Sequence, residues 1–358
     1  AENSIIPGRA VNRLPPIFDG TRLCAVFLHP FFTPPRRSRR QKGYNDMITD
    51  YNTPNRPVII GLDHGYGNMK TAHACFQTGV TRHEKEPTFK NNLLFYDGWY
   101  YTIGEEHKEF TADKMNDPDY FILTLAGIAS ELAFYGRQSA DVHLAVGLPL
   151  TWVAEQKDDC KKYLMQQDPR EEIVFTFKGK EYRIHITDVD VFPQGFAAIV
   201  SHLSDFKGVN MLCDIGNGTM SIMTITNGRP ISSKCFTEKY GTHQCTLLIR
   251  ERLMQKYHVT VDDAVIEEVL RTGTADIDGQ YLDAIIEAAK EYTEGILRRL
   301  QEHEYNPAMM QLYIMGGGGC LLKNFANLDA DRVTINEDIC ATANGYEYMA
   351  NARMRKAG

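Results

Sequence analysis

The chain has 358 residues, of which 43% are hydrophobic, and a formal net charge of −7. This length exceeds what one modest hydrophobic core usually serves, so we expect two globular domains. No run of 18 apolar residues occurs, which argues against a membrane-spanning helix, and the eight cysteines include no Cys-x-x-Cys pair. Scattered cysteines of this kind are typical of reduced thiols, and we expect a cytoplasmic protein.

The first 46 residues differ in composition from the rest of the chain. They hold six of the fifteen prolines, an apolar stretch at 23–32 and eight Lys or Arg against three Asp or Glu. The remaining residues therefore carry 31 basic and 43 acidic side chains, a net charge of −12, which disfavours direct DNA binding by the main body. The apolar stretch precedes the basic run at 36–40, the reverse of a secretory signal. Two interpretations of residues 1–46 remain open. One is a flexible arm or an added extension, with Met47 as a plausible original start, and the other is a basic arm that contacts an acidic partner or a neighbouring subunit.

The segment 57–71, PVIIGLDHGYGNMKT, begins with a β-branched run that predicts a buried strand. The strand ends at Asp63 and is followed by Gly65 and Gly67. Glycines at such a turn let backbone N–H groups approach a polyphosphate, and an aspartate at the strand end can hold a water of hydrated Mg²⁺. Because similar acid-and-glycine turns occur in ordinary hairpins, this segment alone predicts a phosphate site only weakly.

Strands and helices follow one another up to residue 190. We expect a strand at 71–79, a hairpin at 93–103 that turns at Asp97-Gly98, and a helix that opens at Asp117-Pro118. Further on, the sequence predicts a strand at 142–146, a helix at 151–165, and a hairpin formed by 173–177 and 182–186. We assign residues 47–190 to a first domain, with a smaller subdomain at about 80–135.

The acid-and-glycine pattern returns at 209–225, VNMLCDIGNGTMSIMTI. Asp214 is followed by glycines two and four positions later and by a methionine six positions later, which is the spacing found after Asp63, 151 residues earlier. An internal repeat is far more informative than either copy alone. It predicts two related domains whose acid turns face one cleft.

The second half of the chain is richer in predicted helices. A helix opens at 194–198, and apolar residues at three-to-four spacing predict helices at 241–257, 262–271 and 278–304. A buried strand at 311–315 ends in four consecutive glycines, and helices are expected at 320–326 and 339–353. Glycines between a strand and a helix allow a flat ligand to lie against bare backbone. We assign residues 191–358 to a second domain, with a helical subdomain at about 240–305.

Five motifs follow one another in the order found in the actin-like ATPase superfamily, which the chain resembles. They are a first phosphate loop (DHGYGNMK, 63–70), a first connecting helix (FPQGFAA, 192–198), a second phosphate loop (DIGNGTMSI, 214–222), an adenosine motif (GGGG, 316–319) and a second connecting helix (339–353). Within the superfamily, VIIGLDHGYGNMKT and GLPL (147–150) are most similar to the ParM-type bacterial actins. The resemblance implies an actin-like α/β fold of two related domains, each a mixed five-stranded sheet flanked by helices, with a nucleotide cleft between them.

The resemblance also implies roles for individual residues. Asp63 and Asp214 would hold waters of the Mg²⁺ that accompanies the nucleotide, and Gln194 would orient the attacking water, at a place where ParM carries an acidic residue. These three are the candidate catalytic residues. The candidate nucleotide-binding residues are Gly65, Tyr66, Gly67, Asn68 and Lys70 in the first loop, Gly216, Asn217, Gly218 and Thr219 in the second, and Gly316, Gly317 and Gly318 in the adenosine motif. For Lys70, a direct phosphate contact and a structural role in the hairpin both remain open.

The function implied by the resemblance is filament assembly coupled to hydrolysis of ATP or GTP with Mg²⁺, used to segregate plasmid DNA. The implied partners are further copies of the chain and a plasmid-encoded DNA-binding adaptor, without direct membrane contact. Two alternatives of the same fold stay open, a small-molecule kinase that acts on a sugar or an acid and a cell-shape or division protein. A kinase would need a base carboxylate aimed at a substrate hydroxyl, and no convincing candidate accompanies Gln194 in the sequence.

Overall fold

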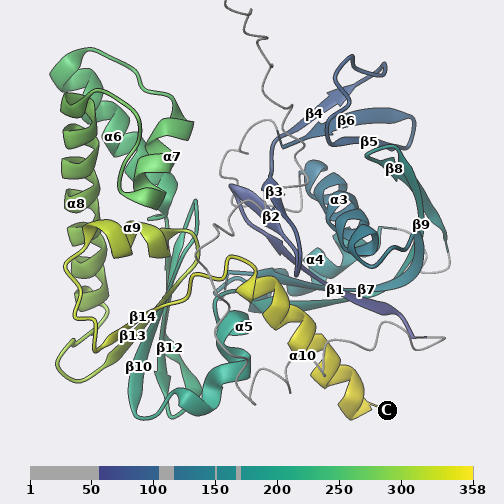
Figure 1. Cartoon of the computed structure of the whole chain (residues 1–358). Helices are drawn as coiled ribbons and strands as arrows, with labels where there is room; N and C mark the ends of the chain where they lie inside the picture. The colour runs from purple at the N-terminus through teal and green to yellow at the C-terminus, as the bar shows by residue number, and fades with distance from the viewer. Residues whose placement is uncertain (1–55, 105–116, 150, 167–170, 358) are drawn as a thin grey trace, which may run out of the picture. The chain divides into compact units, whose positions relative to one another are not determined.

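The computed structural model describes residues 56–104, 117–149, 151–166 and 171–357, all of which belong to one compact unit. They form two β-sheets, each with helices packed against it (Figure 1). The expected arm at 1–46 and Met47 lie outside the described residues. Within the described residues, no helix is long and apolar enough to cross a membrane.

The first sheet has nine strands in the order β3-β2-β1-β7-β9-β8-β5-β6-β4. Their bounds are β1 Val58–His64, β2 Asn68–Lys70, β3 Cys75–Gln77, β4 Val80–His83, β5 Leu93–Tyr96, β6 Trp99–Ile103, β7 Ser139–Leu148, β8 Ile173–Phe177 and β9 Lys180–Pro193. Strands β1, β7 and β9 run parallel, whereas the neighbouring pairs β1–β2 and β8–β9 are antiparallel, so the sheet is mixed. Every residue of β1 is buried, which explains why residues 58–62 form a continuous apolar run rather than an alternating pattern.

The first sheet extends further than the five strands expected. Five of its strands, β3-β2-β1-β7-β9, form the expected mixed sheet, and four more continue it beyond β9. The two hairpins in this extension turn at Asp97-Gly98 and Lys178-Gly179, whose φ angles are all positive, as two-residue type I′ turns require. Both hairpins are evident in the sequence. The pairing of β5 with β8, for example Phe95 with Thr176, is not evident in the sequence, because it joins segments that are distant in the chain.

The strand expected at 71–79 is broken by a tight turn, and only Cys75–Gln77 remains a strand. The N–H of Thr71 donates to the carbonyl of Ala74 at 2.8 Å. The carboxylate of Glu131 accepts the N–H of His73 at 2.8 Å and the Thr71 hydroxyl. Glu131 is buried in the helix 119–134, and its arrival from a distant part of the chain is the reason why the local pattern misleads.

The second sheet has the expected five strands, in the order β12-β11-β10-β13-β14. Their bounds are β10 Val209–Ile215, β11 Met220–Thr226, β12 Arg229–Glu238, β13 Gln311–Met315 and β14 Val333–Ile335. Strands β10, β13 and β14 are parallel, and β10, β11 and β12 are antiparallel neighbours. This is the order and polarity of β3-β2-β1-β7-β9 in the first sheet.

Helices cover both sheets. Their bounds are α3 Asp119–Phe134, α4 Val153–Met165, α5 Phe196–Ile199, α6 Thr242–Tyr257, α7 Asp263–Thr272, α8 Gly279–Glu302, α9 Gly318–Phe325 and α10 Ala341–Ala357, with a 3₁₀ helix, η3, at Val200–Asp205. The side chains of Asp262 and Asp278 accept the N–H groups of Ala264 and Gln280 and so cap α7 and α8. The helix expected after Gln194 is only four residues long before it continues as η3, and α9 begins at Gly318, two residues earlier than expected.

Alternate residues of β1 face different helices. Val58, Ile60 and Leu62 belong to the hydrophobic core that contains α3, whereas Ile59 belongs to a separate cluster with residues of α10. Figure 1 shows α10 on one side of β1 and β7, and α3 on the other. Because side chains alternate along a strand, Asp63 continues the face of Ile59, toward α10.

Candidate functional site

The two acid turns have the same strand register. In the first hairpin Asp63 pairs with Lys70, and in the second Asp214 pairs with Ser221. Both members of the second pair lie 151 residues after those of the first, so the repeat in the sequence is also a repeat in structure. The copies differ in charge at one of these positions, because a lysine in the first hairpin is a serine in the second.

The two turns lie against each other and against the start of α6. A Cβ atom placed on Gly67 would lie 3.0–3.1 Å from side-chain atoms of Asn217. The carbonyl of Asn217 accepts the N–H of His243 at 2.9 Å, and the carbonyl of Gly216 accepts the N–H of Thr242 at 3.0 Å. Both donors belong to the first turn of α6. The structure therefore brings the two predicted phosphate loops together.

Backbone hydrogen bonds shape both predicted phosphate loops. In the first loop, the N–H of Gly65 bonds the Asp63 carbonyl at 2.9 Å. Tyr66 is buried, and burial raises the pKa of its hydroxyl above the usual value. In the second loop, the N–H of Gly216 donates to the carbonyl of Thr219 at 2.9 Å. Asn68 is half-buried, and Gly218 is buried.

Asp63 is held by two side chains from different segments. The Lys70 Nζ lies 3.4 Å from Asp63 Oδ2, and the Gln194 Nε2 donates to Asp63 Oδ1 at 3.1 Å. Burial lowers the pKa of Lys70, but Asp63 and Asp214 raise it by more, so this pKa is higher than usual. Lys70 is therefore a cation that both carboxylates stabilise.

Among the acidic groups of the site, the carboxyl group of Asp214 is the one whose ionised form is most strongly disfavoured. Burial is the main cause, the negative charge of Asp63 adds to it and Lys70 opposes it, and together they raise the pKa of Asp214 to about 6. A carboxylate held in this way gains by acquiring a cation beside it. Asp63 and Asp214 together thus form a place where positive charge is favoured.

This raised pKa predicts a specific pH dependence of stability. The folded chain binds a proton at Asp214 more tightly than the unfolded chain does, so this group opposes folding increasingly as the pH rises from about 4 to about 6. We expect the free energy of unfolding of Asp214→Asn to rise relative to that of wild type between about pH 4 and about pH 6, by at most about 1.4 kcal/mol per pH unit. Above about pH 6 this difference should stay constant. Urea titrations of both proteins from pH 4 to 8 measure the difference, and a difference that is constant with pH would contradict the expected charge.

Gln194 is fixed on both sides by backbone hydrogen bonds. Its N–H donates to the carbonyl of Leu148 at 2.8 Å, and its carbonyl accepts the N–H of Phe196 at 2.8 Å. Between them Gly195 has φ 74° and ψ −59°, which closes a γ-turn of the rare, strained type that favours glycine. A Cβ atom on Gly195 would lie 3.4 Å from the Asp214 side chain. The turn therefore places Gln194 against Asp63 and its neighbour against Asp214.

The glycine run after β13 has packing reasons as well as the expected ligand role. Gly316 has φ 78°, and a Cβ atom there would lie 2.7 Å from Asp214 Oδ1. A Cβ atom on Gly318 would lie 2.2 Å from Cγ2 of the buried Ile215. A Cβ atom on Gly317 would meet nothing within 4 Å. Of the three predicted residues, only Gly317 has open space beside it.

Alanine substitutions separate these two roles. We expect Gly318→Ala to lower the free energy of unfolding by about 1–3 kcal/mol, because the new methyl group would overlap the buried Ile215. Gly317→Ala is the matched control, and its stability should stay within about 0.5 kcal/mol of wild type. Urea unfolding of the two variants measures the difference, and equal stabilities would contradict the close packing of Gly318 on Ile215.

The carboxylates fit the magnesium ion implied by the sequence. Across the described ranges, no three His, Cys, Asp or Glu side chains gather in a group that could enclose a metal ion. Mg²⁺ at nucleotide sites needs no such group, because it keeps several waters and is held by one or two carboxylates together with phosphate oxygens. Asp63 and Asp214 provide two carboxylates whose charges act on each other, so the residues present suit this mode of binding.

Two family models match successive parts of the chain. Residues 61–196 match the N-terminal domain of actin-like proteins, and residues 212–327 match the C-terminal domain of the archaeal, MreB-like actin homologues. The chain is an actin-like protein. The two matched regions contain the two acid turns, in the order that the sequence motifs predict, and the expected actin-like fold is confirmed.

Solved structures of actin-like proteins share this fold. An archaeal actin homolog in complex with ADP is 19% identical, with a TM-score of 0.64 over 82% of this chain and 99% of the other. The apo psk41 ParM protein is 14% identical, with a TM-score of 0.62 over 83% and 98%. A ParM protein from a 15-stranded filament of Clostridium botulinum is 17% identical, with a TM-score of 0.65 over 82% and 99%. A search of curated proteins finds no significant match.

Sequence reasoning missed how closely α10 of this actin-like protein approaches the first sheet. A Cβ atom on Gly61 would lie 2.1 Å from the carbonyl oxygen of Ala343, and one on Gly147 would lie 1.8 Å from the Tyr346 hydroxyl oxygen. The buried Glu347 accepts the N–H of Gly61 at 3.0 Å. The available signal was the glycine inside each strand, which often marks the approach of another backbone or side chain.

The two connecting helices also meet backbone to backbone. A Cβ atom on Gly345 of α10 would lie 2.0 Å from the carbonyl oxygen of Ala197 in α5. The crossing therefore requires glycine at position 345. The helix that begins after Gln194 and the helix near the end of the described chain form one packed pair in the actin-like fold.

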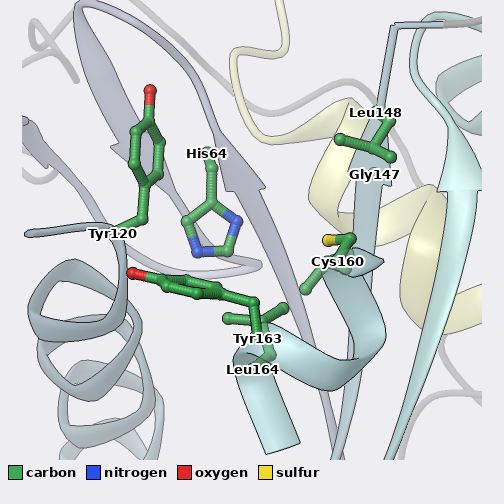
Figure 2. Close-up of a pocket in the computed structure, with 8 residues that line it drawn as sticks. His64, Tyr120, Gly147, Leu148, Cys160, Tyr163 and Leu164 are labelled. Carbon is green, nitrogen blue, oxygen red and sulfur yellow. The ribbon is translucent and has the colours of Figure 1, made fainter. Parts of the chain in front are cut away.

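A small cavity lies on the α3 side of the first sheet. Figure 2 shows His64, Tyr120, Cys160 and Tyr163 among the residues that line it. The His64 Nε2 is 2.8 Å from the Thr124 hydroxyl oxygen, and the Tyr163 hydroxyl donates to the carbonyl of Asp117 at 2.7 Å. These polar groups are used to join β1, α3 and α4. The cavity thus belongs to the packing beside the acid turn, on the face opposite to Asp63.

Proposed function

We propose that this actin-like protein is a filament-forming ATPase that binds ATP or GTP with Mg²⁺ and segregates plasmid DNA by polymerisation. The observation that carries the proposal is the pair of acid turns in identical register, with Gln194 bonded to Asp63 in one of them. A nucleoside triphosphate with its metal is bound by groups of this kind, namely two carboxylates, a lysine and a glycine-rich backbone that lie in contact.

In this proposal the loops Gly65–Asn68 and Gly216–Thr219 bind the phosphates through backbone N–H groups. The N–H groups of Gly65 and Gly216 do not take part, because they bond the Asp63 and Thr219 carbonyls. Lys70 offers the phosphates a positive charge. Gly317, with open space beside it, receives the adenosine portion of the nucleotide. Asp63 and Asp214 hold the Mg²⁺, mainly through its waters. An Mg²⁺ held by these two carboxylates would supply positive charge next to the phosphate oxygens.

Gln194 positions the attacking water. Its Nε2 donates to Asp63, so its Oε1 is the atom that remains to accept a hydrogen bond from water. A neutral amide cannot take the proton as a strong base, and its contribution is therefore one of orientation. Slow hydrolysis of this kind suits a timer that limits the life of a filament.

Self-association and the DNA partner rest on the likeness to ParM. One of the similar structures is a ParM filament, and the region beyond residue 46 carries a net charge of −12. An acidic body is poorly suited to bind DNA itself, so a plasmid-encoded, DNA-binding adaptor would attach the filament. We place the protein in the bacterial cytoplasm, without direct membrane contact.

Sedimentation and light scattering with Mg²⁺ and ATP, GTP or ADP test the proposal, with phosphate release followed in parallel. We expect assembly with the triphosphate and loss of filaments as phosphate is released. A chain that binds nucleotide but never assembles at any protein or salt concentration would overturn the filament. Phosphate transfer stimulated by a sugar or an acid would point instead to the kinase alternative.

A further inference from the structure

Tyr346 is a buried tyrosine of α10. It packs on the face of the first sheet toward which Asp63 also points. The ring of Tyr346 is stacked on Phe192 at a centroid distance of 6.2 Å with an interplanar angle of 18°, and the residue is fully buried. Its hydroxyl oxygen lies directly against Gly147, where a Cβ atom would be only 1.8 Å away. Because no side chain can stand at Gly147, this position gives the hydroxyl access to the end of the sheet.

The strand register places that hydroxyl beside the catalytic candidates. Leu62 pairs with Val146, and Gly147 pairs with Phe192. Asp63 and Gly147 are therefore the next residues along their neighbouring strands, and Gln194 follows Phe192 by two positions. The Tyr346 hydroxyl, which lies against Gly147, is therefore near the strand ends at which Asp63 and Gln194 are found.

The hydroxyl is buried without a hydrogen bond of normal geometry to the described residues. Burial raises the pKa of Tyr346 well above its usual value, and the charges of Asp63 and Asp214 raise it further, while the Gln194 side chain lowers it. Tyr346 is therefore a neutral hydroxyl close to both carboxylates and to the Gln194 amide. A buried hydroxyl without a partner costs stability, which favours an arrangement in which it gains one.

We propose that Tyr346 is a positioning residue that fixes the Gln194 side chain for hydrolysis. The Gln194 Nε2 carries two hydrogens, of which one is donated to Asp63 Oδ1. The Tyr346 hydroxyl oxygen accepts the second when the site closes on its ligand, and the amide is then held at both hydrogens. Its Oε1 is left in one orientation toward the attacking water. The inference rests on the proposed hydrolytic function and links α10 to the reacting water.

Tyr346→Phe is the direct test, because it removes one oxygen and keeps the ring stacked on Phe192. We expect kcat for nucleotide hydrolysis to fall about three- to tenfold, with nucleotide affinity changed less than about twofold. In a Gln194→Ala background the same substitution should have no effect on kcat, because the side chain that it positions is gone. Tyr182→Phe is the matched control and should leave kcat unchanged, since Tyr182 is a buried tyrosine of β9 that is stacked on another aromatic ring, Phe175.

The outcomes separate this inference from the function on which it rests. Absence of hydrolysis in wild type would overturn both. Hydrolysis in wild type with an unchanged Tyr346→Phe would overturn the positioning role alone, and so would an equal loss of kcat in the wild-type and Gln194→Ala backgrounds. Thermal unfolding of every variant shows whether a loss of kcat comes from loss of the fold.

Discussion

Replacing Asp214 by asparagine is expected to reduce Mg²⁺-dependent nucleotide hydrolysis by at least about 100-fold while the fold remains intact. Asparagine keeps the shape of the side chain but removes the charge that would hold the ion. Since burial and the charge of Asp63 oppose ionisation of Asp214, the neutral side chain should also make the chain more stable above pH 6. Activity and stability thus change in opposite directions. Phosphate release and urea unfolding at pH 7.5, a value above this range, measure the two effects.

Asp188→Asn is a control whose free energy of unfolding should change in the opposite direction and decrease. Burial raises the pKa of Asp188, but hydrogen bonds from Lys161 and from the Val189 N–H lower it by more, so the charged form is favoured on folding. This carboxylate is substantially exposed, and its loss should cost less than about 1 kcal/mol without affecting hydrolysis. If Asp214→Asn were instead less stable than wild type, or retained its hydrolysis, the proposed ion site would be wrong.

The parts of the site that could be predicted from sequence are those built from contiguous residues. The acid, the glycines and the strand before them occur within one short segment, and the second copy of the segment predicts that Asp63 and Asp214 are halves of one site. Gln194 was predicted as a site residue because the motif FPQGFAA around it resembles the first connecting helix of the actin-like superfamily. Hairpin turns with glycine, such as Asp97-Gly98, were equally visible because the turn geometry itself requires that residue.

The parts that could not be predicted depend on contacts between distant segments. Glu131 breaks the expected strand at 71–79 from a helix that lies about 60 residues further along the chain, and its carboxylate gives no local sign of that role. The Tyr346 hydroxyl approaches the site only because Gly147, in a different strand, leaves room for it. Gly316 and Gly318 were interpreted as ligand contacts, yet they also pack against Asp214 and Ile215. In each case the neighbouring sequence gives no sign of the contact, because the partner residue is distant in the chain and is brought close only by folding.

Gln194→Ala is expected to assemble with ATP as wild type does, but to hydrolyse it about 100-fold more slowly and to give filaments that persist. Nucleotide binding in the proposal depends on the two turns and on Gly317, none of which includes Gln194, and Asp63 keeps its contact with Lys70. Besides the hydrogen bond to Asp63, the substitution removes the group that orients the attacking water. Gln255→Ala is a matched control, because this exposed glutamine also donates from Nε2 to a carboxylate, that of Glu251, on the surface of α6. Turbidity followed after ATP is limited, together with phosphate release, measures filament lifetime. Rapid disassembly of the Gln194→Ala filaments would show that hydrolysis does not depend on Gln194.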